Sequence, residues 1–240
     1  MPALTLERLL ASLGFGSRKE ARALVRMGLV KLGGEVMADP FLELASRPEF
    51  IEVNGERVPT IERLYGMLHK PLGYECSAKP MHHESVFSLL PERFVAMNVR
   101  TVGRLDVETS GLLLFSNDGG FIHHVESPKK GVTKLYRATL ARPFEPGQEA
   151  ALRRGVMLKD ERAPVTAKSL KRLSETEVEL EISEGLYHQV RRMFAAVGNH
   201  VEALTRLAIG GLALPKNLEP AAYRLLDLPE VLALGYTPES

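Results

Sequence analysis

The pattern of apolar and polar positions near the start of the chain predicts a helix over residues 17–27 and then a hairpin. Ser17 and Glu20 have the spacing of a capping box, and Gly28 suits the end of the helix. At about 100° per residue, one helix face collects the apolar side chains Ala21, Leu24 and Val25. The following letters, LVKLGGEVM, indicate two short strands that turn at Gly33 and Gly34.

From residue 65 onward the pattern changes to short β-rich runs separated by tight turns. The clearest later helix is HQVRRMFAAVG, which places Val190, Phe194 and Val197 on one face. These elements predict an α+β fold, in which a mixed, mostly antiparallel sheet is flanked by helices. The expected strands are Tyr65–Leu68, Leu112–Phe115, Lys134–Leu140, Val165–Leu170 and Val178–Ile182.

The change of pattern also predicts two domains. Residues 58–63, VPTIER, have the character of a short linker between the two patterns. We therefore expect a small N-terminal α/β module over residues 1–60 and a larger domain over residues 61–240.

Composition narrows the class of protein. The chain has 240 residues, of which 45% are hydrophobic, so a substantial core can form. It contains no apolar run of about 18 residues and no apolar signal sequence at its start, so we expect no membrane association. The single cysteine, Cys76, excludes an internal disulfide and Cys-rich zinc sites, and favours a cytoplasmic location.

Net charge is only +1, but the charge is unevenly distributed. Residues 1–31 contain six basic and two acidic side chains, a surplus of four, and residues 151–172 contain seven basic and two acidic ones. Arg18, Arg22 and Arg26 form a stripe at i, i+4 and i+8 along the first predicted helix. Such a stripe is either a solvated helix face or a phosphate-binding surface.

An aspartate stands before a buried run in GRLDVETSGLLLFSNDG, residues 103–119. From local spacing alone, Asp106 could accept hydrogen bonds from backbone amides of the Thr-Ser-Gly turn. A second interpretation joins it with Glu108 and Asp118 in a metal cluster. The spacing disfavours that cluster, because Asp118 lies at the far end of the predicted strand.

The larger pattern resembles a known family. The 103–119 segment is similar to the central motif of the pseudouridine synthases that modify ribosomal RNA. Four other segments match motifs of that family in the same order, within residues 65–214. They are HKPLGYECS, KLYRATL, ISEGLYHQVRRMFAAVGNHV and LTRLAIGGLAL. Residues 4–57 resemble the S-four type RNA-binding module, which is named after a ribosomal protein.

This resemblance implies the pseudouridine synthase fold and a cofactor-free, metal-free isomerisation of uridine to pseudouridine in ribosomal RNA. The details of the segments favour the branch that acts on 16S, small-subunit RNA. Asp106 is implied as the essential carboxylate. It could attack the uracil ring, attack the ribose or remove a ribose proton, and the sequence leaves all three routes open.

The resemblance also assigns roles around Asp106. Arg191 is implied as its cationic partner, and Tyr136 as the ring that stacks on the target uracil. Arg104 is implied as the side chain that occupies the space left by the flipped base. Taken alone, each could instead be an ordinary surface or core residue. Further expected RNA contacts are Arg18, Arg22, Arg26, Lys129, Lys130 and Arg192.

Other functions stay open from the residues. The same reaction on 23S RNA is one alternative, and a catalytically silent RNA-binding assembly factor is another. A metal-dependent phosphohydrolase is a third, although the adjacent histidines at 82–83 and 123–124 suit surface loops better than a metal site. We expect a monomer whose partner is ribosomal RNA or a small-subunit assembly intermediate.

Overall fold

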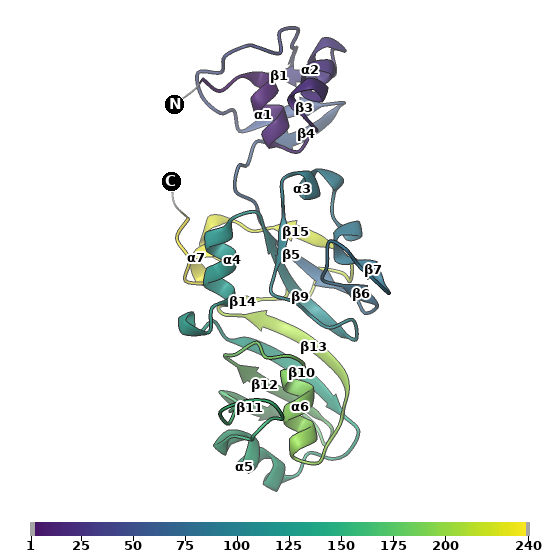
Figure 1. Ribbon diagram of the computed structural model, residues 1–240, viewed down its shortest axis with the longest axis vertical. Helices are drawn as coiled ribbons and strands as arrows, with labels where there is room; N and C mark the ends of the chain where they lie inside the picture. Colours follow the sequence, from purple (N-terminus) through teal and green to yellow (C-terminus); the bar gives the residue numbers. More distant parts are fainter. Residues whose placement is uncertain (1–2, 239–240) are drawn as a thin grey trace. The chain divides into compact units, whose positions relative to one another are not determined.

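The computed structural model describes residues 3–238, and its contacts divide them into two compact units (Figure 1). The first unit extends to Leu64 and also includes Leu90–Arg100. The second contains Tyr65–Leu89 and the chain from Thr101 onward. The segment 90–100 therefore belongs with the N-terminal unit, although the sequence pattern assigned it to the larger domain.

The first unit packs helices against a four-stranded sheet with the order β2-β1-β3-β4. The capping box of Ser17 and Glu20 is present at the start of its second helix, which confirms that expectation. The expected hairpin is also present, with Lys31 opposite Val36. The elements are α1 (Leu6–Ser12), α2 (Arg18–Arg26), β1 (Val30–Leu32), β2 (Glu35–Val36), β3 (Phe50–Val53), β4 (Glu56–Pro59) and α3 (Glu92–Ala96).

A close approach after α1 brings residues 90–100 against the first unit. Leucines of α1 pack with Ala21 and Val25 of α2 and with the inner side chains of the sheet. Gly14, just after α1, has a φ of +84°, and a Cβ there would overlap the backbone of Arg93 in α3. Glycine is thus required both by the backbone angle and by the close approach of α3.

The second unit is built on a nine-stranded sheet. Along its main path the order is β11-β12-β10-β13-β9-β5-β15, with β14 beside β13 and β8 beside β9. Only β9 and β13 run parallel on that path. The strands are β5 (Tyr65–Lys70), β8 (Arg100–Val102), β9 (Thr109–Ser116), β10 (Lys134–Leu140), β11 (Ser169–Arg172), β12 (Glu177–Ile182), β13 (Val201–Ile209), β14 (Leu212–Ala213) and β15 (Tyr223–Leu225). A separate pair consists of β6 (Tyr74–Glu75) and β7 (Glu84–Ser85).

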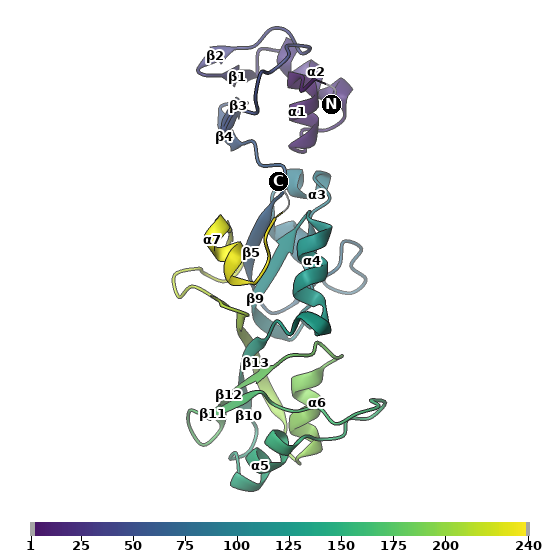
Figure 2. The same cartoon turned by 90° about the vertical axis from the view of Figure 1, so that its left-hand side faces the viewer.

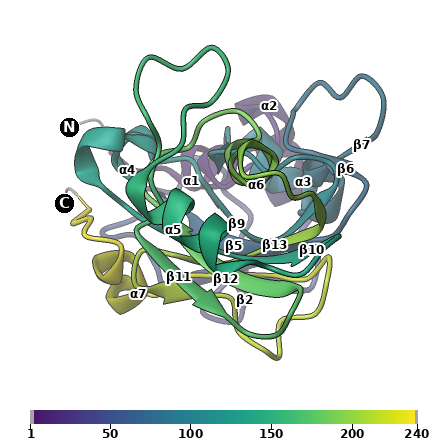
Figure 3. The same ribbon diagram turned by 90° about the horizontal axis from the view of Figure 1, so that it is seen from below.

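Helices of the second unit pack on two parts of this sheet. In one part, α5 and α6 cover β10–β12, and Phe144, Leu152 and Phe194 belong to the shared core. Figures 2 and 3 show α6 lying on one face of these strands. In the other part, α4 and α7 pack near β5 and β9 through residues such as Phe121 and Val231. These elements are η1 (Val86–Leu89), α4 (Gly119–Glu126), η2 (Pro128–Lys130), α5 (Pro146–Arg154), α6 (Gln189–Ala196) and α7 (Leu228–Ala233).

The mixed, mostly antiparallel sheet with flanking helices is the fold class expected from the sequence. One expected strand, Val165–Leu170, is wrong in extent, because β11 begins only at Ser169. Val165 instead forms an isolated bridge with Val156, and the amide of Ala167 donates to the carbonyl of Leu152 in α5. The backbone of residues 165–167 therefore hydrogen-bonds to Val156 and to Leu152 of α5, and the chain joins the sheet only at Ser169. Across residues 3–238, no helix is long and apolar enough to cross a membrane.

Asp118 caps α4 and provides a pH-dependent contribution to stability. Its Oδ1 accepts from the amides of Gly120 and Phe121, and its Oδ2 accepts from the hydroxyls of Tyr65 and Tyr236, at 2.7 and 3.0 Å. Burial acts to raise the pKa of Asp118, but these hydrogen bonds outweigh it and lower that pKa. The charged form is therefore favoured in the folded state.

Asp118→Asn should lower the free energy of unfolding by about 1 kcal/mol at pH 7, because charge-assisted hydrogen bonds are lost. A carboxyl whose pKa is depressed on folding stabilises the protein above its unfolded pKa of about 4, and that contribution is lost as pH falls through the folded value. Urea unfolding at several pH values should thus show the difference from wild type shrinking below about pH 4. A difference independent of pH would contradict this account.

Candidate active site

The candidate site forms where four neighbouring strands of the larger sheet meet one loop. Residues 103–108, here called the aspartate loop, connect β8 to β9 and carry Asp106. The strand order places β10, β13, β9 and β5 side by side. Tyr136 therefore comes from β10 and Lys70 from β5, on either side of the two central strands. Segments far apart in the sequence converge at Asp106.

Lys70 holds the backbone of the aspartate loop from the protein interior. Its side chain is fully buried, and its ammonium donates to the carbonyls of Asp106 and Thr109 at 3.0 and 2.9 Å. It also contacts the carbonyls of Pro71 and Val107. Burial lowers the pKa of Lys70, and the nearby charge of Asp106 opposes that effect. A buried cation surrounded by carbonyl oxygens fixes the backbone that presents the carboxylate.

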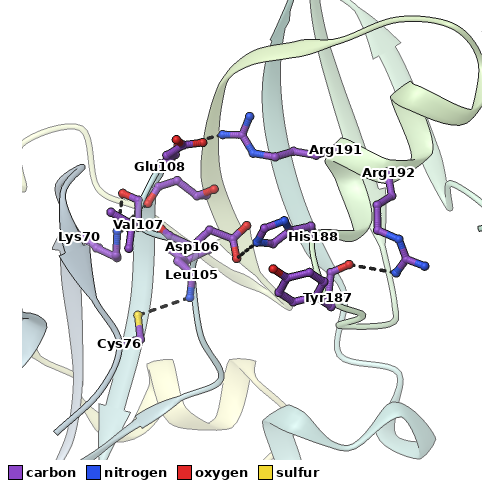
Figure 4. Close-up of polar contacts among 11 residues, drawn as sticks. Lys70, Cys76, Leu105, Asp106, Val107, Glu108, Tyr187, His188, Arg191 and Arg192 are labelled. Atoms are coloured by element: carbon purple, nitrogen blue, oxygen red, sulfur yellow. Dashed lines mark hydrogen bonds and ion pairs between the residues drawn. The ribbon is translucent and has the colours of Figure 1, made fainter. Parts of the chain in front are cut away.

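Three further contacts hold the aspartate loop, and Figure 4 shows the two made by Leu105 and Glu108. The amide of Gly103 donates to Glu126 Oε1 at 2.6 Å, and the carbonyl of Glu108 accepts from Arg191 at 3.0 Å. Between them, the amide of Leu105 donates to Cys76 Sγ at 3.4 Å. Burial raises the pKa of the Cys76 thiol, which suits a packing and hydrogen-bonding role rather than a nucleophile.

The Asp106 carboxylate faces His188. Its Oδ1 lies 3.3 Å from His188 Nε2, and about a third of each side chain is exposed, 35% for Asp106 and 38% for His188 (Figure 4). The carboxylate is thus accessible to a substrate while its backbone is held from within. An imidazole in contact with the carboxylate can help to position it.

His188 reaches Asp106 because of an unusual backbone at the start of α6. Its φ and ψ are 47° and 33°, in the left-handed region that non-glycine residues seldom adopt. Gln189 stabilises this turn, since its side chain accepts from the amide of Leu186 and donates to Glu184. Strain held in place by surrounding contacts is typical of functional positions.

Arg192, like Gln189, stabilises the turn that precedes α6. It forms an ion pair with Glu161 at 2.9 Å and donates to the carbonyls of Tyr187, at 3.1 Å, and Lys159. The RNA contact expected for Arg192 stays a prediction. These intramolecular partners give its guanidinium a structural role that the sequence did not indicate.

Arg191 lies near the aspartate loop and contacts backbone carbonyls. Its guanidinium donates to the carbonyls of Val201 and Glu108 at 2.8 and 3.0 Å. Among residues 3–238 the ion pair of Asp106 is with His188. The direct pairing of Arg191 with Asp106 stays a prediction. The left-handed turn brings His188 to the carboxylate, while Arg191, on the first turn of α6, reaches the loop backbone.

Tyr136 is half-buried in β10 and lies opposite Arg206 of β13. The register between these strands shifts between Leu135 and Tyr136, an irregularity of the kind that redirects side chains near active sites. The Arg206 guanidinium donates from Nη1 to the Tyr136 hydroxyl at 3.4 Å and from Nε to the carbonyl of Leu112 at 2.7 Å. Arg206 is only 4% exposed, so it orients the tyrosine from inside the sheet.

Gly111 allows β9 to approach β13 at this point. Its φ is +110°, and a Cβ would overlap the backbone of Arg206. Residues 109–111, expected from the sequence to form a turn, are the start of β9, and Gly111 is required there by packing between the two parallel strands. It keeps the start of β9 next to Arg206, which in turn lies opposite Tyr136 of β10.

The remaining predicted RNA contacts lie at the surface. Arg104 is exposed on the aspartate loop, and Lys129 and Lys130 are exposed in η2. On α2, Arg18 and Arg26 are exposed, whereas Arg22 forms an ion pair with the buried Glu7. The pKa of Glu7 is lowered mainly by this hydrogen bond from Arg22. The sequence predicts the same role for all three arginines, whereas in the structure Arg22 is paired with a buried acid and Arg18 and Arg26 are exposed.

Sequence reasoning gave no role to three residues of this site: Lys70, His188 and Arg206. Lys70 and Arg206 are charged residues inside otherwise apolar strands, and that pattern was a usable signal because a buried charge needs partners. In the sequence, His188 is only the first residue of the expected helix HQVRRMFAAVG. Its left-handed backbone has no sequence signature.

The acidic residues of the 103–119 segment do not gather around one point. The Asp118 side chain caps α4, and β9 separates it along the chain from Asp106. Among the described residues, no group of three or more His, Cys, Asp or Glu side chains is arranged to hold a metal ion. The side chains that converge on Asp106 are instead a histidine, a buried lysine and, through the backbone, an arginine.

Comparisons with known proteins agree with this architecture. The model of the RNA pseudouridylate synthase family matches residues 65–196. The ribosomal small subunit pseudouridine synthase A of Vibrio cholerae is 39% identical over 91% of this chain and 94% of its own. The protein of that name from Escherichia coli is 36% identical over 91% of this chain and 94% of its own. The one from Salmonella typhimurium is 42% identical over 71% of this chain and 74% of its own.

A solved structure has the same fold over almost the whole chain. The crystal structure of a pseudouridylate synthase is 36% identical, covers 97% of this chain and 100% of its own, and superposes with a TM-score of 0.69. Sequence and fold thus agree over both the aspartate loop and the strands around it. This chain belongs to the RNA pseudouridylate synthase family and is an enzyme that converts uridine to pseudouridine in RNA.

Proposed function

We propose that the substrate of this enzyme is 16S ribosomal RNA and that Asp106 is the carboxylate on which the reaction depends. The similarity to small-subunit enzymes over at least 90% of their length supports the choice of RNA. The observation that carries the choice of residue is the aspartate loop, which presents the accessible carboxylate of Asp106, next to His188, on a backbone fixed by Lys70, Cys76 and Arg191.

The chemistry suits this arrangement. In the isomerisation the bond from ribose C1′ to uracil N1 breaks, a bond from C1′ to C5 forms, and one proton leaves C5 while one is gained at N1. Atoms and electrons balance within one nucleotide. A single carboxylate that acts on the base or the sugar, together with a pocket that retains the detached uracil, is sufficient for such a rearrangement.

The surrounding residues supply the other requirements. We assign Tyr136 to stacking against the target uracil, with Arg206 fixing its hydroxyl. We assign Arg191 to holding the aspartate loop through the carbonyl of Glu108. Exposed Arg104 is suited to enter the space that the target base leaves when it flips out of its stack.

We further propose that the N-terminal unit binds RNA through the exposed arginines of α2 and that the enzyme acts as a cytoplasmic monomer. Arg18 and Arg26 are the available charges, since Arg22 is paired with Glu7. Lys129 and Lys130 add an exposed basic turn in the second unit.

The double substitution Arg18→Gln and Arg26→Gln should weaken RNA binding and reduce its salt dependence. Each lost phosphate contact should lower the slope of log K against log salt by about 0.7 to 0.9, so two contacts give roughly 1.4 to 1.8. Binding to 16S RNA fragments would be measured between 50 and 200 mM salt. Arg57→Gln, which changes an exposed arginine of the same unit, is the control. An unchanged slope in the double variant would remove α2 from the RNA-binding surface.

The substrate assignment is tested with purified enzyme and ribosomal RNA from a strain that lacks this gene. We expect pseudouridine to form at a site in 16S RNA, in the presence of a chelator. Conversion of 23S RNA alone would overturn the choice of substrate. Loss of activity on chelation would contradict the cofactor-free mechanism.

A further inference from the structure

One pair of stacked rings beside Asp106 includes an exposed ring, Tyr187, that has no role in the reaction described above. The rings of Tyr187 and His188 stack with centroids 3.8 Å apart and planes 16° from parallel. His188 contacts Asp106 on its other side, and Tyr187 is 71% exposed (Figure 4). Carboxylate, imidazole and phenol ring therefore follow one another from the catalytic residue toward solvent.

Tyr187 is held in place from several sides. Its carbonyl accepts from Arg192, which is itself ion-paired with Glu161. Its neighbours Leu186 and His188 belong to the turn that Gln189 stabilises. The exposed ring is thus attached to a supported backbone and backed by a second ring. Such a fixed ring loses little conformational freedom when a ligand stacks on it.

We propose that the Tyr187–His188 ring pair is a stacking site for a nucleobase of an unpaired nucleotide next to the target uridine. This inference rests on the proposed function. When the target nucleotide leaves its stack, a neighbouring base loses a stacking partner, and an aromatic face can replace that partner whatever the base is.

The position of the pair favours a neighbouring base over the target base. The target must present its sugar or ring to Asp106, and Tyr136 is assigned to its uracil. The contacts of 3.3 Å and 3.8 Å keep the outer side of Tyr187 close enough to Asp106 for a nucleotide joined directly to the target.

The first test measures affinity without turnover. In an Asp106→Asn background, Tyr187→Ala should weaken binding of a 16S RNA fragment that contains the modified uridine by about 5- to 150-fold. Tyr187→Phe keeps the ring and should bind within about 3-fold of the Asp106→Asn parent, because stacking needs no hydroxyl. Leu232→Ala removes another exposed apolar side chain, on α7, and should leave affinity unchanged.

The second test locates the base. The same fragment would carry 2-aminopurine in place of each nucleotide flanking the target in turn, and the absence of tryptophan from the protein gives a low fluorescence background. We expect enzyme binding to quench one flanking position, and this quenching to be lost in Tyr187→Ala and kept in Tyr187→Phe.

Turnover separates this inference from the proposed function. With Asp106 intact, Tyr187→Ala should raise KM by a factor similar to the loss of affinity, while kcat at saturating RNA stays within about 3-fold of wild type. Equal RNA affinity of the Tyr187→Ala and parent proteins, or an effect equally large in Tyr187→Phe, would overturn the stacking site. Failure of the wild-type enzyme to modify the RNA would instead overturn the proposed substrate.

Discussion

Replacing Asp106 with asparagine is expected to abolish isomerisation and to leave RNA binding nearly unchanged. The amide has the shape of the carboxylate and can remain in contact with His188, but it cannot act as a nucleophile or base. The aspartate loop should keep its position, because Lys70, Cys76 and Arg191 hold its backbone rather than the Asp106 side chain.

Turnover of Asp106→Asn would be followed by release of tritium from C5 of labelled uridine in 16S RNA. Asp160→Asn, the same chemical change at an exposed site, is the control and should retain wild-type turnover. Any rate above a few per cent of wild type in Asp106→Asn would show that the essential carboxylate has been assigned to the wrong residue.

The second large effect is expected from Lys70→Met. Methionine removes every donor from a fully buried position that faces the carbonyls of Pro71, Asp106, Val107 and Thr109. Unsatisfied buried polar groups are costly, so the free energy of unfolding should fall by about 3 kcal/mol or more. Turnover should fall even at temperatures at which the variant is folded, because the aspartate loop is no longer fixed.

Two further variants make the Lys70 result interpretable. Lys70→Gln keeps an amide donor and should lie between Lys70→Met and wild type in both stability and turnover. Lys216→Met removes an exposed lysine and should change stability by no more than about 0.5 kcal/mol. If Lys70→Met unfolded in urea at the wild-type midpoint, the buried ammonium would not be a support of the loop.

The sequence was most informative where function and fold depend on local pattern. The capping box at Ser17, the glycine hairpin and the helix after residue 188 were all predicted from short-range spacing, and the structure confirms them. The order of five motifs identified the family, which the comparisons confirm. The extent of β11 was predicted less well, because hydrogen bonding to α5 decides where that strand begins.

The partners around Asp106 depend on long-range geometry that no local pattern contains. Lys70 lies 36 positions before Asp106 and meets it only because β5 and β9 are neighbours in the sheet. His188 meets it through a left-handed turn that is set by Gln189 and Arg192. For the same reason, Arg22 and Arg192 looked like free surface charges in the sequence, although each has an acidic partner in the structure.

The central claim is that this enzyme forms pseudouridine in 16S ribosomal RNA through Asp106. The most direct measurement is chemical mapping of pseudouridine in both 16S and 23S RNA from a strain that lacks the gene and from the same strain complemented with wild type or with Asp106→Asn. We predict that one 16S site loses its modification, that wild type restores it, and that Asp106→Asn does not. Restoration by Asp106→Asn, or a lost site only in 23S RNA, would contradict the account.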